Sequence, residues 1–192
     1  MNNIKNELKK YTVGIAGCGG LGSNCAMALA RVGIGKLIIA DFDTIDLSNL
    51  NRQYFFLDQV GQKKCFALKE NISKITRNTV VEAYDIKLSP TEIIDLFHDC
   101  DVIVEAFDRK EMKQMIVETV ITAFPKKPLV VGSGLAGWGH NNSIRARKVD
   151  NLYICGDESR ETSDDLPPLA PRVGIVANMQ ANTVLEILLG EG

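Results

Sequence analysis

The chain has 192 residues, of which 45% are hydrophobic and 24% are charged, and its formal net charge is −2. This length suits one domain with a full core and would be cramped for two, so we predict a single domain over residues 1–192. A charge this close to zero gives no support to a protein that binds nucleic acid electrostatically.

Membrane spans and secretory signals are not visible in the sequence. No apolar run approaches the ~18 residues that a membrane span needs, and the opening stretch, MNNIKNELKK, is polar. The five cysteines are odd in number and scattered, without a C-x-x-C pair, which is typical of reduced thiols and gives no support to a structural zinc. We therefore expect a cytoplasmic protein that needs neither a membrane nor zinc.

Apolar strands alternate with helical patterns along most of the chain, which predicts an α/β fold: a Rossmann-like, mainly parallel sheet with helices on both faces. Strands are expected over residues 12–16, 36–41, 79–83, 101–106 and 129–132. Helices are expected over residues 23–32, 62–75 and 110–124, and another is expected to begin at Ser89-Pro90-Thr91 and to end near Phe97.

The pattern changes after Gly134. Residues 143–149 alternate in character, which suggests a partly antiparallel C-terminal extension of the sheet, and residues 156–165 form a polar stretch. We expect that stretch to be an exposed, mobile loop. Pro171 then opens a last helix, which Gly190 ends.

A glycine motif, G-x-G-x-x-G, is formed by Gly17, Gly19 and Gly22 between a predicted strand and a predicted helix, and Asp41 follows about 20 residues later. In this context the glycines let the backbone approach phosphates, whose charge is met by the N–H groups of the helix N-terminus, while Asp41 can accept hydrogen bonds from a ribose. The alternative is that the glycines only permit a tight turn. The motif indicates an adenosine nucleotide, but NAD, FAD and ATP would all satisfy it.

A polar cluster follows Asp41. It contains Asp43, Ser48, Asn49, Arg52 and Gln53, and then Lys63 and Lys64 at the start of the next predicted helix. A hydride-transfer site gains little from extra cations beside the phosphates, whereas a reaction at phosphorus needs charge stabilisation on the phosphate oxygens and the leaving group. The cluster therefore favours phosphorus chemistry. The alternative is that its cations form a solvated surface.

A carboxylate, Asp108, follows the apolar strand over residues 101–106, at the carboxyl end where open parallel sheets bind their ligands. Beside a nucleotide it would be a natural Mg²⁺ ligand, because Mg²⁺ usually takes one or two carboxylates, substrate phosphates and water. Asp108 would alternatively be the N-cap of the helix over residues 110–124, and both roles can hold together.

In these residues and their spacing, the chain resembles the superfamily of ubiquitin-activating-like adenylyltransferases. The resemblance is strongest to the short ThiF type, which activates the sulfur carrier protein of thiamine biosynthesis. It rests on GCGGLGS (17–23), DFDTIDLSNLNRQ (41–53), VGQKK (60–64), EAFDRKEMK (105–113) and VANMQANTVLEILLG (176–190), and it covers nearly the whole chain.

The resemblance implies a site for ATP and Mg²⁺. Its nucleotide-binding residues would be Gly17, Gly19, Gly20, Leu21, Gly22, Asp41, Asp43, Ser48, Asn49, Arg52, Gln53 and Lys64. Arg52, Lys64 and Asp108 would be the catalytic residues, with Asp108 on the metal. The implied partner is a small ubiquitin-fold carrier ending in Gly-Gly, whose terminal carboxylate becomes an acyl-adenylate, and a homodimer is expected.

The chain departs from its apparent relatives in three places. The two C-x-x-C pairs that hold zinc in many of them are absent, and only Cys155 remains in that region. The stretch SDDLPPLAPRVG before the last helix has no cysteine for a covalent link to the carrier, and a small buried role is expected for Cys155. The segment before Val13 offers Lys5, Lys9 and Lys10 but no arginine to lend to a partner's site.

Two other function classes stay open. An NAD-dependent oxidoreductase would use the glycine motif but leaves residues 49–53 unexplained. A non-catalytic, nucleotide-binding partner subunit would have no need of Arg52, Lys64 and Asp108. The sequence does not name the carrier or its pathway.

Overall fold

The computed structural model describes residues 2–190 and contains a seven-stranded sheet with the order β3-β2-β1-β4-β5-β7-β6. Its strands are β1 (Thr12–Ala16), β2 (Lys36–Ala40), β3 (Val80–Tyr84), β4 (Val102–Glu105), β5 (Leu129–Ser133), β6 (Arg145–Val149) and β7 (Leu152–Gly156). All neighbouring strands are parallel except β6 and β7, which are antiparallel. The predicted α/β class, with a partly antiparallel C-terminal extension, is therefore confirmed.

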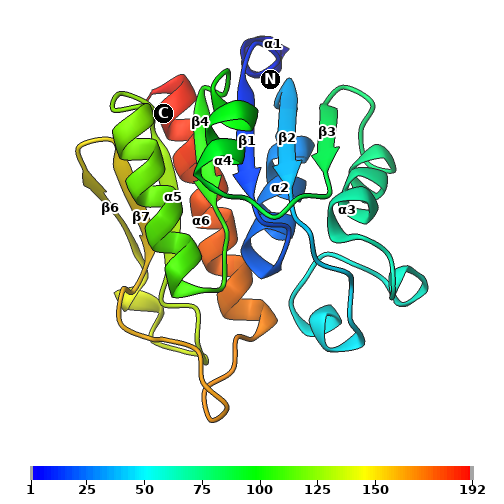
Figure 1. Cartoon of the computed structure of the whole chain (residues 1–192), viewed down its shortest axis with the longest axis vertical. Helices are drawn as coiled ribbons and strands as arrows, with labels where there is room; N and C mark the ends of the chain where they lie inside the picture. The colour runs from blue at the N-terminus through cyan, green and yellow to red at the C-terminus, as the bar shows by residue number, and fades with distance from the viewer. Residues whose placement is uncertain (1, 191–192) are drawn as a thin grey trace.

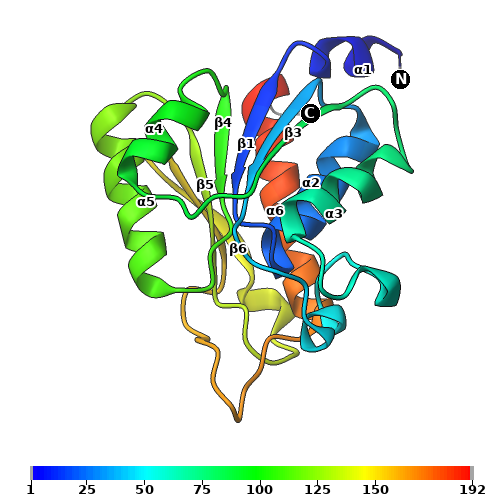
Figure 2. The same ribbon diagram turned by 45° about the vertical axis from the view of Figure 1, so that its right-hand side comes forward.

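The helices are α1 (Asn2–Leu8), α2 (Gly20–Val32), α3 (Lys64–Ser73), α4 (Pro90–Phe97), α5 (Lys110–Ala123) and α6 (Ala170–Leu189), and short 3₁₀ turns lie at η1 (Leu47–Asn51), η2 (Leu57–Gln59) and η3 (Asn141–Ser143). Helices α2, α3 and α6 cover one face of the sheet, and α4 and α5 cover the other (Figures 1 and 2). Each face has its own apolar core, since the buried side chains divide into two clusters.

Local signals explain where the helices begin and end. Ser89 and Glu92 form a capping box before α4, and Pro90 occupies its first turn. Helix α2 ends at Gly33, whose φ of 94° lies in the left-handed region that favours glycine. Such signals are readable in the sequence, and the predicted boundaries of these helices lie close to the observed ones.

Two elements were not predicted. Helix α1 is short and mostly polar, so its pattern is weak, yet its last residue, Leu8, is 1% exposed and belongs to the core. Strand β7 is a short apolar run after a charged turn, and it lies between β5 and β6 in the sheet. Its parallel pairing with β5 depends on residues far away in the sequence, which a local pattern does not reveal.

The carboxyl ends of the parallel strands meet at the lower edge of the sheet in Figure 1, where residues 157–169 form a long loop between β7 and α6. Open parallel sheets bind their ligands at this edge. Several side chains of the loop are exposed, as predicted from the sequence, while its mobility stays a prediction. None of the helices described over residues 2–190 has the length and apolar character to cross a membrane.

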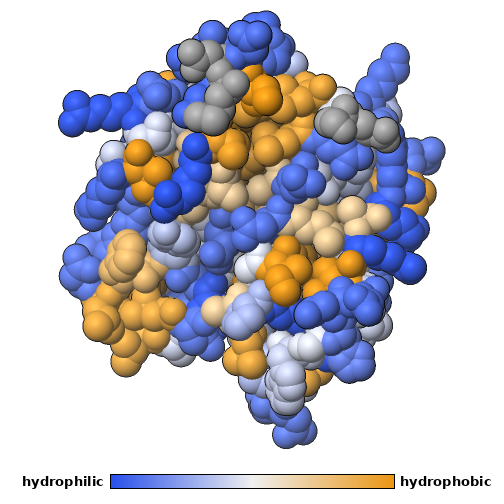
Figure 3. All heavy atoms as spheres, turned by 180° about the vertical axis from the view of Figure 1, so that it is seen from behind, coloured by the Kyte–Doolittle hydropathy of each residue, from blue (hydrophilic) through white to orange (hydrophobic). Residues whose placement is uncertain are grey.

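The face that carries α2, α3 and α6 shows separate apolar patches with hydrophilic side chains between them (Figure 3). Exposed apolar residues of α6 include Ile175 and Leu189, which are 43% and 39% exposed. Leu57 of η2 is 74% exposed.

Candidate nucleotide-binding site

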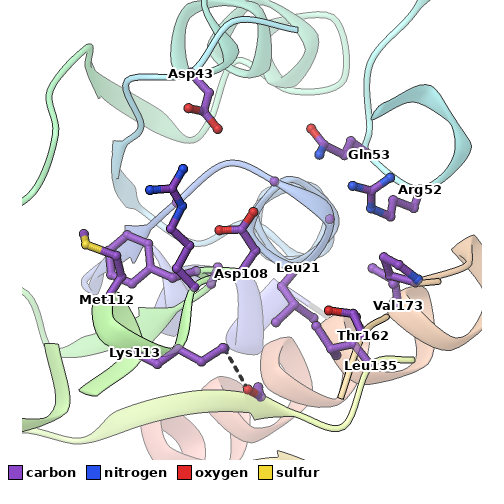
Figure 4. Close-up of a pocket in the computed structure, with 18 of the residues that line it drawn as sticks. Leu21, Asp43, Arg52, Gln53, Asp108, Met112, Lys113, Leu135, Thr162 and Val173 are labelled. Atoms are coloured by element: carbon purple, nitrogen blue, oxygen red, sulfur yellow. Dashed lines mark hydrogen bonds between the residues drawn. The ribbon is translucent and has the colours of Figure 1, made fainter. Parts of the chain in front are cut away.

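A pocket of about 850 Å³ opens at the carboxyl edge of the sheet. This volume lies in the range of small-molecule sites, roughly 300–1,000 Å³. The pocket is lined by the glycine loop, by the segment after β2, by the start of α5 and by the loop over residues 157–169. Figure 4 shows side chains from these separate segments arranged around one common space.

Most of the residues predicted for the site meet in this pocket. They are Gly17, Gly19, Gly20, Leu21, Asp41, Asp43, Arg52, Gln53, Lys64 and Asp108. Three predicted residues, Gly22, Ser48 and Asn49, do not line it.

The glycine loop turns tightly between β1 and α2. Gly17 has φ +101°, and a Cβ atom there would lie 2.9 Å from the carbonyl oxygen of Ala106. Gly19 is the N-cap of α2, and a glycine has no side chain to cap the first N–H groups of the helix. The N–H groups of the first turn of α2 are thus available for an anion at the pocket, as in known phosphate sites.

Gly22 lies behind the loop and serves packing. A Cβ atom at Gly22 would collide with the carbonyl oxygen of Gly17, and it would lie 3.1 Å from the Cβ atom of Ala106. The third glycine of the motif therefore allows close packing of α2 against the loop, without itself lining the pocket.

Replacing Gly22 with alanine is expected to lower the free energy of unfolding by about 1–3 kcal/mol, because the new methyl group meets rigid backbone. The displaced first turn of α2 should also lower the affinity for ATP. Urea unfolding and calorimetric titration with ATP measure the two effects. The matched control is Gly174→Ala in α6, where an added Cβ meets nothing within 4 Å and stability should be unchanged or higher.

Asp41 connects the glycine loop to the segment after β2. Its Oδ2 accepts a hydrogen bond from the N–H of Cys18 at 2.6 Å, and its Oδ1 accepts one from the N–H of Asp43 at 2.7 Å. Burial raises the pKa of Asp41 above its ordinary value, although these two N–H groups and Lys64 oppose the shift. A carboxylate has about four lone-pair sites, so Asp41 can still accept a hydrogen bond from a ribose hydroxyl.

The two adjacent lysines have different surroundings. Lys64 is almost buried, with 7% of its side chain exposed, and its Nζ lies 2.8 Å from Oδ2 of Asp43. Lys63 lies outside the pocket, where its Nζ is 3.0 Å from Oδ1 of Asp85 and 2.8 Å from the carbonyl oxygen of Phe42. Of these two lysines, Lys64 is the one that lines the pocket.

Arg52 and Gln53 enter the pocket from the turn after η1 (Figure 4). Nη1 of Arg52 donates to the carbonyl oxygen of Ser48 at 3.2 Å and to Oδ1 of Asn51 at 2.7 Å, which orients the guanidinium group. Oε1 of Gln53 is buried and has no hydrogen-bond partner among the described residues. A buried polar atom without a partner is uncommon in proteins, and at a pocket wall it is free to bond to a polar ligand or to water.

Ser48 and Asn49 stabilise the turn that presents Arg52. The side chain of Asp46 accepts hydrogen bonds from the N–H and the hydroxyl group of Ser48, and Oδ1 of Asn49 accepts one from the N–H of Asp46 at 3.0 Å. Together they form a capping box on η1. The resemblance implies that both residues bind the nucleotide, and this stays a prediction; in the structure their side chains hold the turn.

Asp108 lies three residues after the end of β4, is exposed and lines the pocket. The N-cap of α5 is Arg109, so the alternative role of Asp108 as a cap is not what the structure shows. No group of three or more His, Cys, Asp or Glu side chains over residues 2–190 could hold a metal ion by itself. An Mg²⁺ ion at Asp108 would therefore also need phosphate and water ligands, and this is its usual arrangement beside a nucleotide.

The loop over residues 157–169 is fastened by a buried arginine that was not predicted from the sequence. Arg172, in the first turn of α6, is 2% exposed and forms an ion pair with Asp157. It also donates to the carbonyl oxygens of Gly134 at 3.1 Å and Gly139 at 2.8 Å. The signal in the sequence is a lone charge in the otherwise apolar stretch LAPRVG.

The five cysteines are free and buried. The Sγ of Cys155 is 3.5 Å from Oγ1 of Thr183, and burial raises the pKa of its thiol. The expected role of Cys155 as a small buried residue is confirmed.

The ThiF family matches residues 2–192, and the chain therefore belongs to this family. Among its relatives, the adenylyltransferase and sulfurtransferase UBA4 of Scheffersomyces stipitis is 28% identical over 96% of this chain. The molybdopterin-synthase adenylyltransferase of Escherichia coli is also 28% identical over 96% of the chain. This chain spans 43% of the first relative and 76% of the second.

A similar fold occurs in the E. coli tRNA N6-threonylcarbamoyladenosine dehydratase TcdA, whose crystal structure was solved in complex with AMP. The TM-score is 0.88 with 19% sequence identity, over 97% of this chain and 89% of the other. At this identity the likeness concerns the fold.

Proposed function

We propose that this chain is an adenylyltransferase that uses ATP to activate the C-terminal carboxylate of a small ubiquitin-fold sulfur carrier ending in Gly-Gly. The observation that supports it most is that one pocket joins the glycine loop and Asp41 to Arg52, Lys64 and Asp108. Membership of the ThiF family and the names of two relatives as adenylyltransferases support the reaction class.

The nucleotide would lie along the glycine loop. The free N–H groups at the start of α2 suit the phosphates, and the Asp41 carboxylate suits the ribose. The buried, unpaired Oε1 of Gln53 is consistent with a polar ligand in this pocket. A nicotinamide cofactor would also fit a glycine loop, but it would not account for Arg52 and Lys64 in the same pocket.

The reaction would be an attack by the carrier's carboxylate oxygen on the α-phosphorus of ATP, with cleavage of the bond to the bridging oxygen and release of pyrophosphate. The terminal carboxylate, with a reference pKa of about 3.5, is already ionised at neutral pH and needs no general base. The barrier is therefore mainly electrostatic. Arg52 and Lys64 would stabilise the negative charge, and Mg²⁺ at Asp108 would neutralise phosphate oxygens.

Three finer assignments belong to this proposal. The carrier is that of thiamine thiazole synthesis, the protein works in the cytoplasm, and it forms a homodimer. The competing carriers are those that serve molybdopterin synthesis or another sulfur transfer. Incubation with each carrier separately distinguishes them, because the cognate one should give the highest kcat/KM.

The proposed reaction is tested by ATP–pyrophosphate exchange. The protein is incubated with ATP, Mg²⁺, labelled pyrophosphate and a Gly-Gly-ending carrier, and label should enter ATP only when the carrier is present. A carrier that lacks its last glycine is the control. Tight binding of NADH without binding of ATP would support the oxidoreductase instead, and ATP binding without exchange with any of the carriers would support a non-catalytic partner subunit.

Truncating Arg52 should lower the rate more than it lowers nucleotide binding. We expect Arg52→Ala to reduce kcat of exchange by about 10²-fold, as for the loss of a single stabilising donor, with only a small change in the Kd for ATP. Arg31→Ala is the control: Arg31 is exposed, donates only to the Tyr54 hydroxyl among the described residues, and should leave the rate unchanged. A loss of ATP affinity equal to the loss in kcat would assign Arg52 to ground-state binding.

A further inference from the structure

A buried ion pair lies next to the segment that presents Asp108. Glu105, the last residue of β4, is fully buried, and Lys113 of α5 is 28% exposed at its side chain. Nζ of Lys113 lies 2.9 Å and 3.0 Å from the two carboxylate oxygens of Glu105 and 2.9 Å from the carbonyl oxygen of Gly132. All three N–H bonds of this ammonium group therefore have acceptors.

The same carboxylate holds the backbone that leads to Asp108. Oε1 of Glu105 accepts a hydrogen bond from the N–H of Phe107 at 2.7 Å. The N–H of Lys113 donates to the carbonyl oxygen of Arg109 at 3.0 Å, so the lysine belongs to the first turn of α5. The ion pair thus fixes the short segment between β4 and α5 at both of its ends.

The main chain of Glu105 is also held. Its carbonyl oxygen accepts a hydrogen bond from Nε2 of Gln180 at 2.9 Å, from the middle of α6. Through Gly132, Lys113 and Gln180, Glu105 is linked to β5, α5 and α6. A carboxylate fixed in this way cannot turn toward the pocket as a second ligand.

The charges of the pair determine which carboxylate stays free. Lys113 neutralises Glu105, and its donors are used by Glu105 and the carbonyl oxygen of Gly132. The carboxylate of Asp108 has no hydrogen-bond or ion-pair partner among the described residues. In Figure 4 the ammonium end of Lys113 and the Asp108 carboxylate do not point toward each other. Without Glu105, the lysine would gain by pairing with Asp108 across the same pocket wall.

Stability alone does not account for such a pair. Replacing a buried ion pair by apolar side chains is often neutral or stabilising, so its presence beside a pocket suggests a role in positioning. We propose that Glu105 and Lys113 are positioning residues, which hold Asp108 as the free cation ligand of the nucleotide site and keep the lysine from neutralising it. This inference rests on the proposed function, because it assumes that the nucleotide binds together with a divalent cation.

The experiment compares binding of ATP with and without Mg²⁺ by calorimetry. For the whole wild-type chain, Mg²⁺ should increase the affinity for ATP. We expect Glu105→Gln to lower the affinity for ATP with Mg²⁺ by about 10-fold, as for mutations of residues that orient metal ligands. The affinity for metal-free ATP should stay within about 2-fold of wild type. Mn²⁺ binding in the presence of ATP, followed by electron paramagnetic resonance, should weaken to a similar degree.

Two further comparisons identify the cause. Asp108→Asn should show the same pattern, and the double variant with Glu105→Gln should lose little more than either single variant, because both act through one carboxylate. Lys113→Arg, which can still pair with Glu105, should keep most of the metal dependence. Lys113→Met tests the pair from its other side, and it serves as the test if Glu105→Gln does not fold.

Lys127→Met is a matched control. Lys127 also donates three hydrogen bonds, to the carbonyl oxygens of Phe97, His98 and Cys100, but it lies outside the pocket. Its loss should lower the melting temperature without changing the effect of Mg²⁺. Equal weakening of ATP binding with and without metal in the Glu105 and Lys113 variants, or fully additive losses with Asp108→Asn, would overturn the inference.

The outcomes separate this inference from the proposed function. The calorimetric measurements do not use a carrier, so a wild-type chain that binds ATP with Mg²⁺ but never exchanges pyrophosphate would contradict only the proposed reaction. A chain that exchanges pyrophosphate, but whose metal dependence survives the loss of Glu105, would contradict only the positioning role.

Discussion

Replacing Lys64 with methionine is expected to lower kcat of carrier-dependent ATP–pyrophosphate exchange by about 10³-fold. This is the upper end of the effects seen when one donor that stabilises the transition-state charge is removed. Lys64 is almost buried, so its charge acts on the phosphates through a medium of lower dielectric than water. Methionine preserves most of the apolar stem. The only ion-pair partner of Lys64 among the described residues is Asp43, whose side chain is 47% exposed. Water can solvate this carboxylate after the substitution, so the fold should persist.

Lys63→Met is the control for this prediction, because it removes the same charge one residue earlier in the chain. Lys63 pairs with Asp85 outside the pocket, and its loss should change kcat by less than about 2-fold, as expected for an exposed cation. Circular dichroism and the Kd for ATP should remain close to wild type in both variants. Similar rate losses in the two variants would show that net charge, not the position of Lys64, supports the reaction.

The sequence was sufficient for much of the fold because its strands are apolar runs with clear punctuation. The predicted strand over residues 12–16 coincides with β1, and the helix predicted to end at residue 32 does so, with Gly33 following it in the left-handed conformation. The place of β7 was not predictable in this way. Its pairing with β5 joins Leu152 to Leu129, and such a register depends on the assembled sheet.

The site was predicted less completely, for a related reason. A motif places backbone near a ligand, but it does not show which way each side chain turns. The resemblance implies that Ser48 and Asn49 bind the nucleotide, and only the structure reveals that their side chains form hydrogen bonds with Asp46 in the turn. Glu105 and Lys113 lie on different elements, and their pairing becomes visible only when β4 and α5 are in place.

Replacing Arg172 with methionine should have the largest effect on stability, because it removes the closer charged partner of the buried Asp157 carboxylate and leaves only Arg160, whose Nε lies 3.8 Å from Oδ2. The side chains of Arg172 and Asp157 are both 2% exposed. Loss of one member of a buried ion pair typically costs about 3–5 kcal/mol in the free energy of unfolding. Urea unfolding at pH 7 measures this cost, and increased proteolysis within residues 157–169 would show that the loop is released.

The control is Arg147→Met, since Arg147 pairs with the neighbouring Glu158 on the surface, and little or no change in stability is expected. A similar loss in both variants would contradict the importance of the buried pair.

The effect of Arg172→Met should also depend on pH. Burial acts to raise the pKa of Asp157, but the N–H groups of Ser159 and Arg160 and the charge of Arg172 outweigh it and hold the pKa below its ordinary value. A carboxyl group with a lowered pKa stabilises the fold above its unfolded pKa of about 3.9, and this contribution is lost as the pH falls toward the folded pKa. Without Arg172, one of the groups that lower the pKa of Asp157 is lost, and the charged form of its carboxylate is less favoured. The difference in the free energy of unfolding between wild type and Arg172→Met should therefore be largest near pH 7 and should become smaller below about pH 4. If the loss of stability came only from packing, this difference would not depend on pH in this way.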